Sequence, residues 1–345
     1  MNGLKQKNIA TWLYLEGIDE NGTYPQVKGK SYTPKFHDIY KNCLVTFFLS
    51  AKKSNPDAAF FLFCNIDLIS STREIDVSLM TLFRELDVKF INLQFTFQPP
   101  EEQRKWRNQF YVLDILKYFS YEMNEKSSCV ILDGDVIWSS APATSKLWNE
   151  LTEIGYLNML PIKERDEVIN GLSLDELAKL SRRLGNLNVD IQYAGGEFIA
   201  LRGDYLKKVF QRSSYYWEAY KRYLLTSDSA LIEEAHFLSI VYSSLGMKYG
   251  EGDKYIRRIW TQVFHYSNRQ PRDIDLVCWH LPAEKRFGIR RTAQRFLNEG
   301  NEWPSFESKH WQRMVRELAL TRNSGRKILQ DLSISIKDRI SEICK

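Results

Sequence analysis

The sequence predicts an α/β fold built around a largely parallel sheet. In its first part, compact apolar runs of strand length alternate with segments whose apolar residues recur at helical spacing, as in strands joined by crossover helices. The last of these runs ends in Asp133, Gly134 and Asp135, and open parallel sheets bind ligands at the carboxyl ends of their strands. With 345 residues, of which 43% are hydrophobic, the chain is long enough to bury a large core.

The strands expected in the first part are short and apolar. They are Ile9–Leu15, Ala58–Cys64, Val88–Leu93 and Ser128–Leu132. Helices are expected between them, because apolar residues recur there three and four positions apart. These helices are His37–Lys53, Val77–Leu86 and Glu101–Asn124. In the last of them, the periodicity puts Arg107, Tyr111 and Asp114 on a different face from the apolar stripe.

The later part of the chain is more mixed. Residues 161–184 are polar and charged, which indicates a surface insertion over the site. After it we expect a strand interrupted by glycines, two helices and a short strand. They are Asp190–Leu201, Tyr215–Leu225, Ala230–Leu245 and Leu276–His280. From Arg290 onward, apolar spacing predicts two or three amphipathic helices, so a main domain is expected over 1–289 and a basic helical extension over 290–345.

Composition excludes several classes of protein. The polar opening, Met1–Asn8, precedes only a short apolar segment, which is not the pattern of a signal peptide. No window reaches the roughly 20 apolar residues that span a bilayer. The five cysteines are widely spaced and form no CxxC pair, so they predict neither a zinc site nor a disulfide framework. We expect reduced, buried thiols in a cytoplasmic protein.

Positive charge is concentrated at the end of the chain. Residues 286–345 hold 13 basic and 7 acidic residues, whereas the rest of the chain holds 35 and 36. Such a tail can meet an anionic membrane or form a solvated helical surface, and no nucleic-acid partner is expected. Four apolar residues there have helical spacing and could enter a lipid interface or pack on the main domain. They are Trp311, Met314, Val315 and Leu318.

Asp133 and Asp135 indicate a metal site. In an extended segment, side chains two positions apart lie on the same face, and Gly134 between them lets a bulky ligand approach. Two such carboxylates repel each other unless a cation lies between them. A hard divalent ion, Mn²⁺ or Mg²⁺, favours oxygen ligands and also binds phosphate. The alternative interpretation is a pair of aspartates in a solvated turn.

The segment Cys129–Trp138, an apolar strand that runs into Asp-Gly-Asp, resembles the DxD signature of glycosyltransferases with the GT-A fold. The resemblance covers about residues 5–288 in the order of elements, but only three short stretches in sequence. It implies a Rossmann-like mixed sheet flanked by helices, with 1–289 as the catalytic domain. It also implies a metal-bound nucleotide-diphosphate sugar as donor, most often a UDP-sugar, with Gly134 beside it.

A second stretch, Gln192–Ala200, is similar to the glycine-containing strand of GT-A enzymes that lies beside the donor sugar and the acceptor. The resemblance implies that Gln192, Gly195 and Gly196 line the sugar and acceptor pocket. Glycine suits a strand that a ligand must approach closely. A β-bulge without a ligand is the alternative.

The third stretch, Trp279–Arg286, resembles the HxxGxxKP element of family 8 glycosyltransferases. The resemblance implies that His280 is the third metal ligand and that Lys285 or Arg286 contacts the donor diphosphate. The sequence departs from the pattern at Ala283, which replaces the glycine and leaves the phosphate contact open. A structural histidine is the alternative interpretation.

A carboxylate is also expected near the reaction centre. In GT-A enzymes an acidic residue at the start of a helix comparable to Ala230–Leu245 faces the reacting atoms, and Glu234 matches best. It could act as a general base on the acceptor hydroxyl, or stabilise oxocarbenium character if configuration is retained. Glu233 and Glu234 could equally be ordinary acidic residues at a helix N-terminus.

Donor contacts are expected from the helix that precedes the DxD strand, the element that often reaches the nucleotide in GT-A enzymes. An aromatic ring suits stacking on a base and an arginine suits phosphate, although the tyrosine could belong to the core. The candidates are Arg107, Asn108, Tyr111 and Asp114, with Tyr14 at the end of the first strand as a weaker one.

These features predict a metal-dependent, hexosyltransferase-type glycosyltransferase. It would move a sugar from a nucleotide-diphosphate donor to a hydroxyl of a glycan or another acceptor, with Mn²⁺ or Mg²⁺ as cofactor. One alternative is a sugar nucleotidyltransferase, although residues 16–30 lack a convincing phosphate-binding loop. The other is a non-catalytic GT-A-like binding module that recruits a partner through its basic tail.

Overall fold

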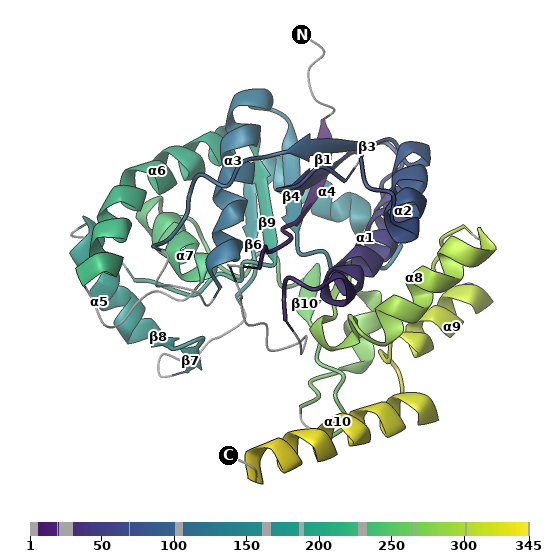
Figure 1. Cartoon of the computed structure of the whole chain (residues 1–345). Helices are drawn as coiled ribbons and strands as arrows, with labels where there is room; N and C mark the ends of the chain where they lie inside the picture. Colours follow the sequence, from purple (N-terminus) through teal and green to yellow (C-terminus); the bar gives the residue numbers. More distant parts are fainter. Residues whose placement is uncertain are drawn as a thin grey trace.

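The structure, a computed structural model, describes residues 6–18, 20, 30–68, 70–100, 106–160, 167–185, 190–226, 233–264, 266–300 and 302–343. Within these ranges the chain forms a six-stranded sheet, a three-stranded sheet and a two-stranded hairpin, with helices around them (Figure 1). The predicted α/β class is confirmed.

The six-stranded sheet is mixed. Its order is β3 (Val88–Asn92), β2 (Ala59–Cys64), β1 (Lys7–Leu13), β4 (Ser128–Leu132), β9 (Phe198–Arg202) and β6 (Tyr156–Asn158). The first four strands run parallel, whereas β9 is antiparallel to both of its neighbours. The four strands expected in the first part of the sequence form the parallel part, close to their predicted positions.

Helices cover both faces of this sheet, which explains why its strands are continuously apolar. In β2 every residue is buried: Phe60 and Leu62 face one hydrophobic cluster, and Phe61 and Phe63 face the other. The first cluster contains α1 (Pro34–Ser54), α2 (Glu74–Glu85) and α4 (Thr144–Ile154). The second contains α3 (Tyr111–Glu122), α5 (Leu174–Gly185), α6 (Gly203–Thr226) and α7 (Glu234–Ser244), on the opposite side of the sheet (Figure 1).

The three-stranded sheet joins the middle of the chain to its later part. It consists of β10 (Ile256–Arg258), β11 (Cys278–His280) and β5 (Val136–Trp138). β11 is antiparallel to β5, and this register sets His280 opposite Val136. Because Val136 directly follows Asp135, the predicted late strand lies beside the DxD segment.

The predicted start of the long helix Glu101–Asn124 is wrong. Residues 101–105 lie outside the described residues, and Trp106 has a φ of 60°, in the left-handed region. A bulky residue rarely adopts that conformation, and it interrupts a right-handed helix. The segment therefore starts as a 3₁₀ helix, η1 (Arg107–Phe110), and becomes α-helical only from Tyr111.

Two predictions for the later part are also corrected. The strand expected over Asp190–Leu201 is confined to β9, so the two glycines precede it. The polar segment predicted as a surface insertion contains the hairpin of β7 (Val168–Ile169) and β8 (Leu172–Ser173) and then α5, of which Leu177 and Leu180 are buried in the second cluster. Among its charged residues, apolar residues recur at helical spacing and form a stripe that packs inward.

In the described part of the chain, three helices follow the two sheets: α8 (Gly288–Glu299), α9 (Lys309–Glu317) and α10 (Gly325–Ile343). The predicted boundary at 289/290 falls inside α8, and α8 and α9 contribute to the first hydrophobic cluster. The sequence left open whether four apolar residues enter a lipid interface or pack on the main domain, and they pack inward. Trp311, Met314, Val315 and Leu318 are at most 3% exposed. In addition, Trp311 donates an indole hydrogen bond to the Ser139 carbonyl at 2.8 Å. These side chains therefore belong to the core and not to a lipid interface.

The cysteine prediction is confirmed for the part of the chain that the structure describes, where Cys43, Cys64, Cys129 and Cys278 are free and buried. Cys344 lies outside the described residues. Among the helices that could be assessed, none is both long and apolar enough to pass through a bilayer.

Candidate active site

The carboxyl end of β4 carries the two predicted metal-binding carboxylates. After Leu132 the chain leaves the six-stranded sheet, and the Asp133 amide donates to the Glu197 carbonyl at 3.3 Å. A tight turn follows, in which the Val136 amide donates to the Asp133 carbonyl at 3.1 Å, and β5 begins. A Cβ atom on Gly134 would lie 3.5 Å from the side chain of Leu44 and 3.7 Å from that of Thr11, which are ordinary contact distances, so the packing of the turn alone does not require a glycine there.

Asp133, Asp135 and His280 form a candidate metal-binding triad, as the sequence predicted. One potential ligand atom from each residue lies within 4.8 Å of the others. The His280 Nε2 atom is 3.2 Å from Asp135 Oδ2 and 3.6 Å from Asp133 Oδ2. Asp135 and His280 are buried, whereas the Asp133 side chain remains 34% exposed.

One buried atom tests whether these residues fit a cation. Asp135 Oδ2 is shielded from solvent, yet no group in the described ranges donates a well-aligned hydrogen bond to it. His280 Nε2 and Lys285 Nζ, each 3.2 Å away, supply positive charge beside it. A buried carboxylate oxygen without a donor is costly unless a charge compensates it. Two carboxylates and one imidazole are ligands that Mn²⁺ and Mg²⁺ accept, so the triad fits the predicted cofactor.

The pKa values of the site also depend on compensating charges. Burial alone would lower the pKa of His280, but Asp135 and Glu197 raise it to about 9. Burial would raise the pKa of Asp135, but Lys285 and His280 lower it below its usual range. Burial, aided by the charge of Asp135, raises the pKa of Asp133 to about 6. Positive charge from protein groups therefore stabilises the aspartates where a cation would act.

Glu197 and Arg258 are residues of the candidate site that sequence reasoning missed. Glu197 Oε1 lies 3.3 Å from Nδ1 of His280 and accepts a hydrogen bond of 2.7 Å from Nε of Arg258. A carboxylate on Nδ1 fixes the ring and leaves Nε2 as the metal-binding nitrogen. Burial would raise the pKa of Glu197, but Arg258 and His280 lower it to about 2. The only sequence signal was that Glu197 follows the two glycines.

Of the two predicted diphosphate contacts, the structure places Lys285 in the site. Its Nζ atom is 3.2 Å from Asp135 Oδ2 and 5.2 Å from the centre of the Tyr40 ring. Burial would lower the pKa of Lys285, but Asp135 and Tyr40 raise it. Arg286 is not among the residues that line the cavity described next.

A cavity of about 350 Å³ opens beside the triad and Lys285. Its volume lies within the roughly 300 to 1,000 Å³ that is usual for small-ligand sites. Several aromatic side chains line it: Trp12, Tyr14, Phe36, Tyr40, Trp106 and Trp260. Apart from Tyr14, no sequence pattern distinguished these rings from the aromatic residues of the core, where such residues are equally frequent. Flat rings of this kind suit stacking against a base or a sugar.

A polar group also lines the cavity. Buried Glu16 accepts a hydrogen bond of 2.6 Å from Asn108 Nδ2 and another from the Ser31 hydroxyl. Tyr14, which also lines the cavity, donates to Glu20 at 2.7 Å. Asn108 and Tyr14 were predicted as donor-binding residues and line the cavity, whereas Glu16 and Ser31 were missed.

The other predicted donor residues lie elsewhere. Tyr111 is fully buried and donates to the Leu93 carbonyl at 2.8 Å. Asp114 is buried and accepts the amides of Thr96 and Phe97 at 2.8 and 3.2 Å, so it holds a loop. The reason is that α3 turns the face carrying both residues away from the cavity.

Arg107 and Gln192 likewise lie outside the cavity lining. Arg107 donates to the Gln98 side chain at 2.7 Å and to the Pro99 carbonyl at 3.3 Å. Its guanidinium group therefore already donates hydrogen bonds to the segment that precedes η1.

The two glutamates at the start of α7 occupy different positions. Glu233 lines the cavity and accepts hydrogen bonds from Tyr193 and Asn170. Glu234 is buried behind it, and its Oε2 atom has no hydrogen-bond donor among the described residues. Burial, with the charges of Glu233 and Asp133, raises the pKa of Glu234 well above its usual range.

Gly195 and Gly196 make room for these carboxylates. A Cβ atom on Gly196 would lie 2.1 Å from Oε1 of Glu234, and one on Gly195 would lie 2.4 Å from Oε2 of Glu197. Both distances are far shorter than van der Waals contact. Each glycine thus permits a functional carboxylate to reach its place.

Two solved structures are similar to this chain. One is an active-site mutant of LgtC, 13% identical, with a TM-score of 0.47, covering 92% of this chain and 98% of that one. The other is the galactosyltransferase LgtC in complex with donor and acceptor sugar analogues, 14% identical, with a TM-score of 0.47, covering 89% and 99%. No protein-family model and no curated protein sequence matches the chain. Because identity and TM-score are low, we base the function on the residues of the site.

Proposed function

We propose that the protein is a GT-A-type, metal-dependent glycosyltransferase that uses a nucleotide-diphosphate sugar, a UDP-sugar foremost, and a hydroxyl acceptor. The observation that carries this proposal is the meeting of three features in one cavity. These are a carboxylate and imidazole triad fit for a hard cation, a lysine beside it, and a wall of aromatic rings. A diphosphate needs the first two, and a base with its sugar needs the third.

The roles of the residues follow from their positions. Asp133, Asp135 and His280 would hold Mn²⁺ or Mg²⁺, which when bound supplies electrostatic stabilisation of the leaving diphosphate. Glu197 keeps the His280 ring oriented through Nδ1. Lys285, already next to Asp135, provides a second positive charge for the same phosphate groups.

The aromatic wall and the Glu16 group would bind the nucleoside. Stacking against Tyr14 or a tryptophan of the cavity orients the base, and the carboxylate of Glu16 can accept hydrogen bonds from ribose hydroxyls or a base N–H. The acceptor hydroxyl would approach from the side of Gly195 and Gly196. We propose that Glu234, in its deprotonated form, stabilises charge or accepts a proton there, with Glu233 as the carboxylate that lines the cavity.

The experiment is a donor screen that measures nucleoside diphosphate release with Mn²⁺, with Mg²⁺ and with excess chelator. Release that requires a metal and is lost in Asp133→Asn supports the proposal. Full release in chelator contradicts it. A parallel reaction with nucleoside triphosphate and sugar 1-phosphate tests the nucleotidyltransferase alternative, because that enzyme would liberate pyrophosphate. Donor binding without any release in either reaction would identify a binding module.

Location is a separate part of the proposal. We propose a cytoplasmic protein, with peripheral membrane contact through the basic extension as a further expectation. The buried positions of Trp311 and Met314 leave basic side chains as the means of such contact. Co-sedimentation with anionic and neutral vesicles at low and high salt tests it, and equal pelleting with both contradicts it.

A further inference from the structure

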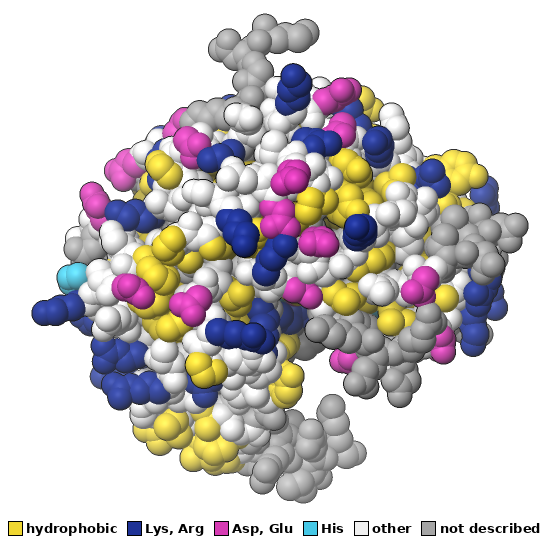
Figure 2. Space-filling view, turned by 180° about the vertical axis from the view of Figure 1, so that it is seen from behind, with side chains coloured by type: hydrophobic (Ala, Val, Ile, Leu, Met, Phe, Trp, Pro, Cys, Tyr) yellow, Lys and Arg dark blue, Asp and Glu magenta, His cyan; other side chains and the backbone are white. Residues whose placement is uncertain are grey.

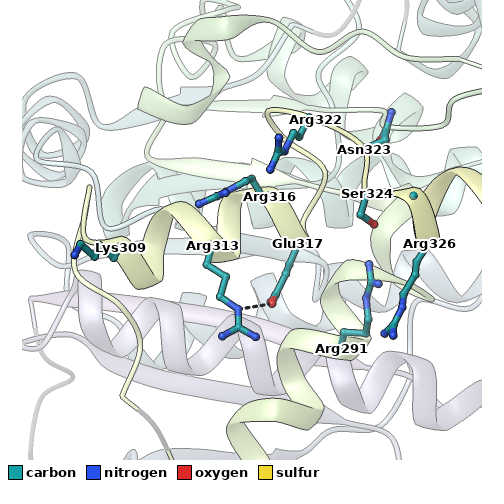
Figure 3. A pocket seen from close by; sticks show the side chains of 10 residues that line it. Arg291, Lys309, Arg313, Arg316, Glu317, Arg322, Asn323, Ser324 and Arg326 are labelled. Atoms are coloured by element: carbon teal, nitrogen blue, oxygen red, sulfur yellow. Dashed lines mark hydrogen bonds and ion pairs between the residues drawn. The ribbon is translucent and has the colours of Figure 1, made fainter.

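A second cavity lies away from the candidate active site, between the three C-terminal helices. Its volume is about 770 Å³. Figure 3 labels nine of the residues that line it, which come from α8, from α9, from the loop between α9 and α10 and from the start of α10. We call it the basic pocket. It is lined by Arg291, Lys309, Arg313, Arg316, Glu317, Arg322, Asn323, Ser324, Gly325 and Arg326.

The charges of the basic pocket are unbalanced. Six of its side chains are cationic and one is a carboxylate. That carboxylate, Glu317, already pairs with Arg313 at 3.2 Å and with Arg295 at 2.7 Å. No carboxylate within the described residues pairs with Arg291, Lys309, Arg316, Arg322 or Arg326. Figure 2 shows Lys and Arg side chains gathered at this end of the molecule, at the left of that view.

The sequence places these cations together at an energetic cost. Lys309, Arg313 and Arg316 follow one another four and three positions apart on α9, so they share a face, and like charges at that spacing destabilise a helix. Neither α9 nor α10 has an acidic residue in its first turn, where a negative charge would be favourable. Moreover, Nε of Arg291 is shielded from solvent and has no acceptor in the described part of the chain. An anion would relieve all three costs.

The segments that carry the cations are held in place. The opposite face of α9 is buried in the hydrophobic core, and Trp311 is fixed by its bond to Ser139. The loop between α9 and α10 is held by Arg269, which donates to the Ala319 carbonyl at 2.8 Å. At the start of α10, buried Lys327 pairs with Glu284 at 3.2 Å and with Asp331 at 2.8 Å. The arginines therefore extend from a preorganised frame.

We propose that the basic pocket binds a compact soluble ligand that carries two or more phosphate or sulfate groups. The planar guanidinium groups of its arginines match the oxygens of such groups in pairs. The amide groups at the start of α10 add further donors for an anion. A concave space of this volume suits a small molecule, whereas a membrane surface requires a flat or convex face. The proposal does not depend on the transferase activity.

The experiment uses inorganic tripolyphosphate as the probe and isothermal titration of the full chain in chelator, at constant ionic strength. Three proteins are compared: the unaltered chain, the double variant Arg322→Ala and Arg326→Ala, and the matched control Arg290→Ala. Arg290 is exposed on α8 next to Arg291 but does not line the basic pocket, so its removal changes charge without changing the site. All three substituted arginines are exposed, so the variants should keep the fold.

We expect saturable binding with one site, a dissociation constant at least tenfold weaker in the double variant, and a change within twofold in the control. An equal loss in the control, or binding without saturation, would show that the probe only condenses on a basic surface and would overturn the proposal. A parallel titration uses vesicles of anionic and of neutral lipid. Binding to anionic vesicles without any to tripolyphosphate would also overturn it, because the surface would then serve a membrane.

Discussion

The ammonium group of Lys285 lies 3.2 Å from Oδ2 of Asp135, the oxygen that also lies 3.2 Å from Nε2 of His280. One buried carboxylate oxygen thus has two cationic groups beside it. Its negative charge is compensated by the protein before any metal enters. A metal bound there would therefore have to displace a proton from His280 and rearrange the contact with Lys285. This competition makes the site's behaviour depend on pH and on which aspartate is altered.

The two aspartates should differ when each is replaced. Asp133→Ala removes a partly exposed ligand, so metal binding and turnover should be lost while the melting temperature changes little. Asp135→Ala leaves buried Lys285 without its carboxylate and removes one of the three carboxylates beside His280, which should cost about 3 to 5 kcal/mol of folding stability as well. Thermal unfolding and metal titration on both variants check this, and equal melting temperatures would contradict it.

Metal affinity should rise with pH. Because the pKa of His280 is raised to about 9, a proton competes with the metal throughout the neutral range, and affinity should increase about tenfold per pH unit up to that value. Below about pH 6 the dependence should steepen, since Asp133 also becomes protonated. Mn²⁺ titrations over this range measure the slope. Glu197→Gln is the matched variant: removing its charge should lower the pKa of His280 and move the curve to lower pH. A pH-independent affinity would refute the protonated state of His280.

Glu234 and Gly196 should act as one unit in catalysis. Glu234→Gln should lower turnover by roughly 10² to 10⁴, with donor binding little changed. Gly196→Ala should produce a similar loss, because its Cβ would displace the carboxylate of Glu234, and it should add little in the Glu234→Gln background. Gly195→Ala is the control, since its Cβ would meet Glu197 instead and so impair metal binding. If Glu233→Gln loses turnover while Glu234→Gln keeps it, the catalytic assignment moves to Glu233.

Glu234→Gln should also change stability in a pH-dependent way. The pKa of Glu234 is raised in the folded state, so the folded chain binds this proton more tightly than the unfolded chain does. The resulting stability is fully present below the unfolded pKa, near the ordinary value of 4.5, and is lost as the pH rises toward the folded pKa. Glutamine stays neutral. The melting temperature of the variant relative to the unaltered chain should therefore increase as the pH rises above the ordinary value of 4.5. A constant difference would mean that Glu234 is charged in the fold.

Much of the fold could be predicted because its signals are local. The apolar runs of β2 and β4 and the helical spacing of α1 lie within short windows, and Asp133 and Asp135 are neighbours in the chain. Such patterns can be recognised without knowledge of distant contacts. The start of α3 was mispredicted because a left-handed residue, Trp106, has no reliable sequence signal when it is not glycine or asparagine.

Much of the site depends on pairing between distant segments. Glu16 meets Asn108, and Glu197 meets both Arg258 and His280, only after the two sheets have assembled. Nothing in either local sequence marks these partners. By contrast, Tyr111 and Asp114 had suitable chemistry for a nucleotide, but the rotation of α3 about its axis, which composition does not determine, directs them into the core and a loop.

The C-terminal helix should be part of the site's stability. Lys327 on α10 is 1% exposed and pairs with Glu284, which is fully buried and directly precedes Lys285. Among the described residues, Lys327→Met would leave that carboxylate with the Thr261 hydroxyl and the Gly288 amide as donors, and should cost about 3 to 5 kcal/mol. Adding Glu284→Gln should recover the part of the loss that the Glu284 charge causes, whereas Asp331, the second partner of Lys327, stays without its cation. Denaturant unfolding of the two variants checks this, and an equal loss in both would refute the pairing.

The same contact has a consequence for how the protein matures during synthesis. Glu284 leaves the ribosome well before Lys327, and domains generally begin to fold from the N-terminal side while the chain is still growing. Until α10 emerges, the loop that carries Lys285 contains a carboxylate without its cation and is poorly suited to bury itself. The sheets can therefore form during translation, whereas we expect the loop that carries Lys285 to close only afterwards. A nascent chain halted before Lys327 would then have Asp133 and Asp135 in place but not yet Lys285.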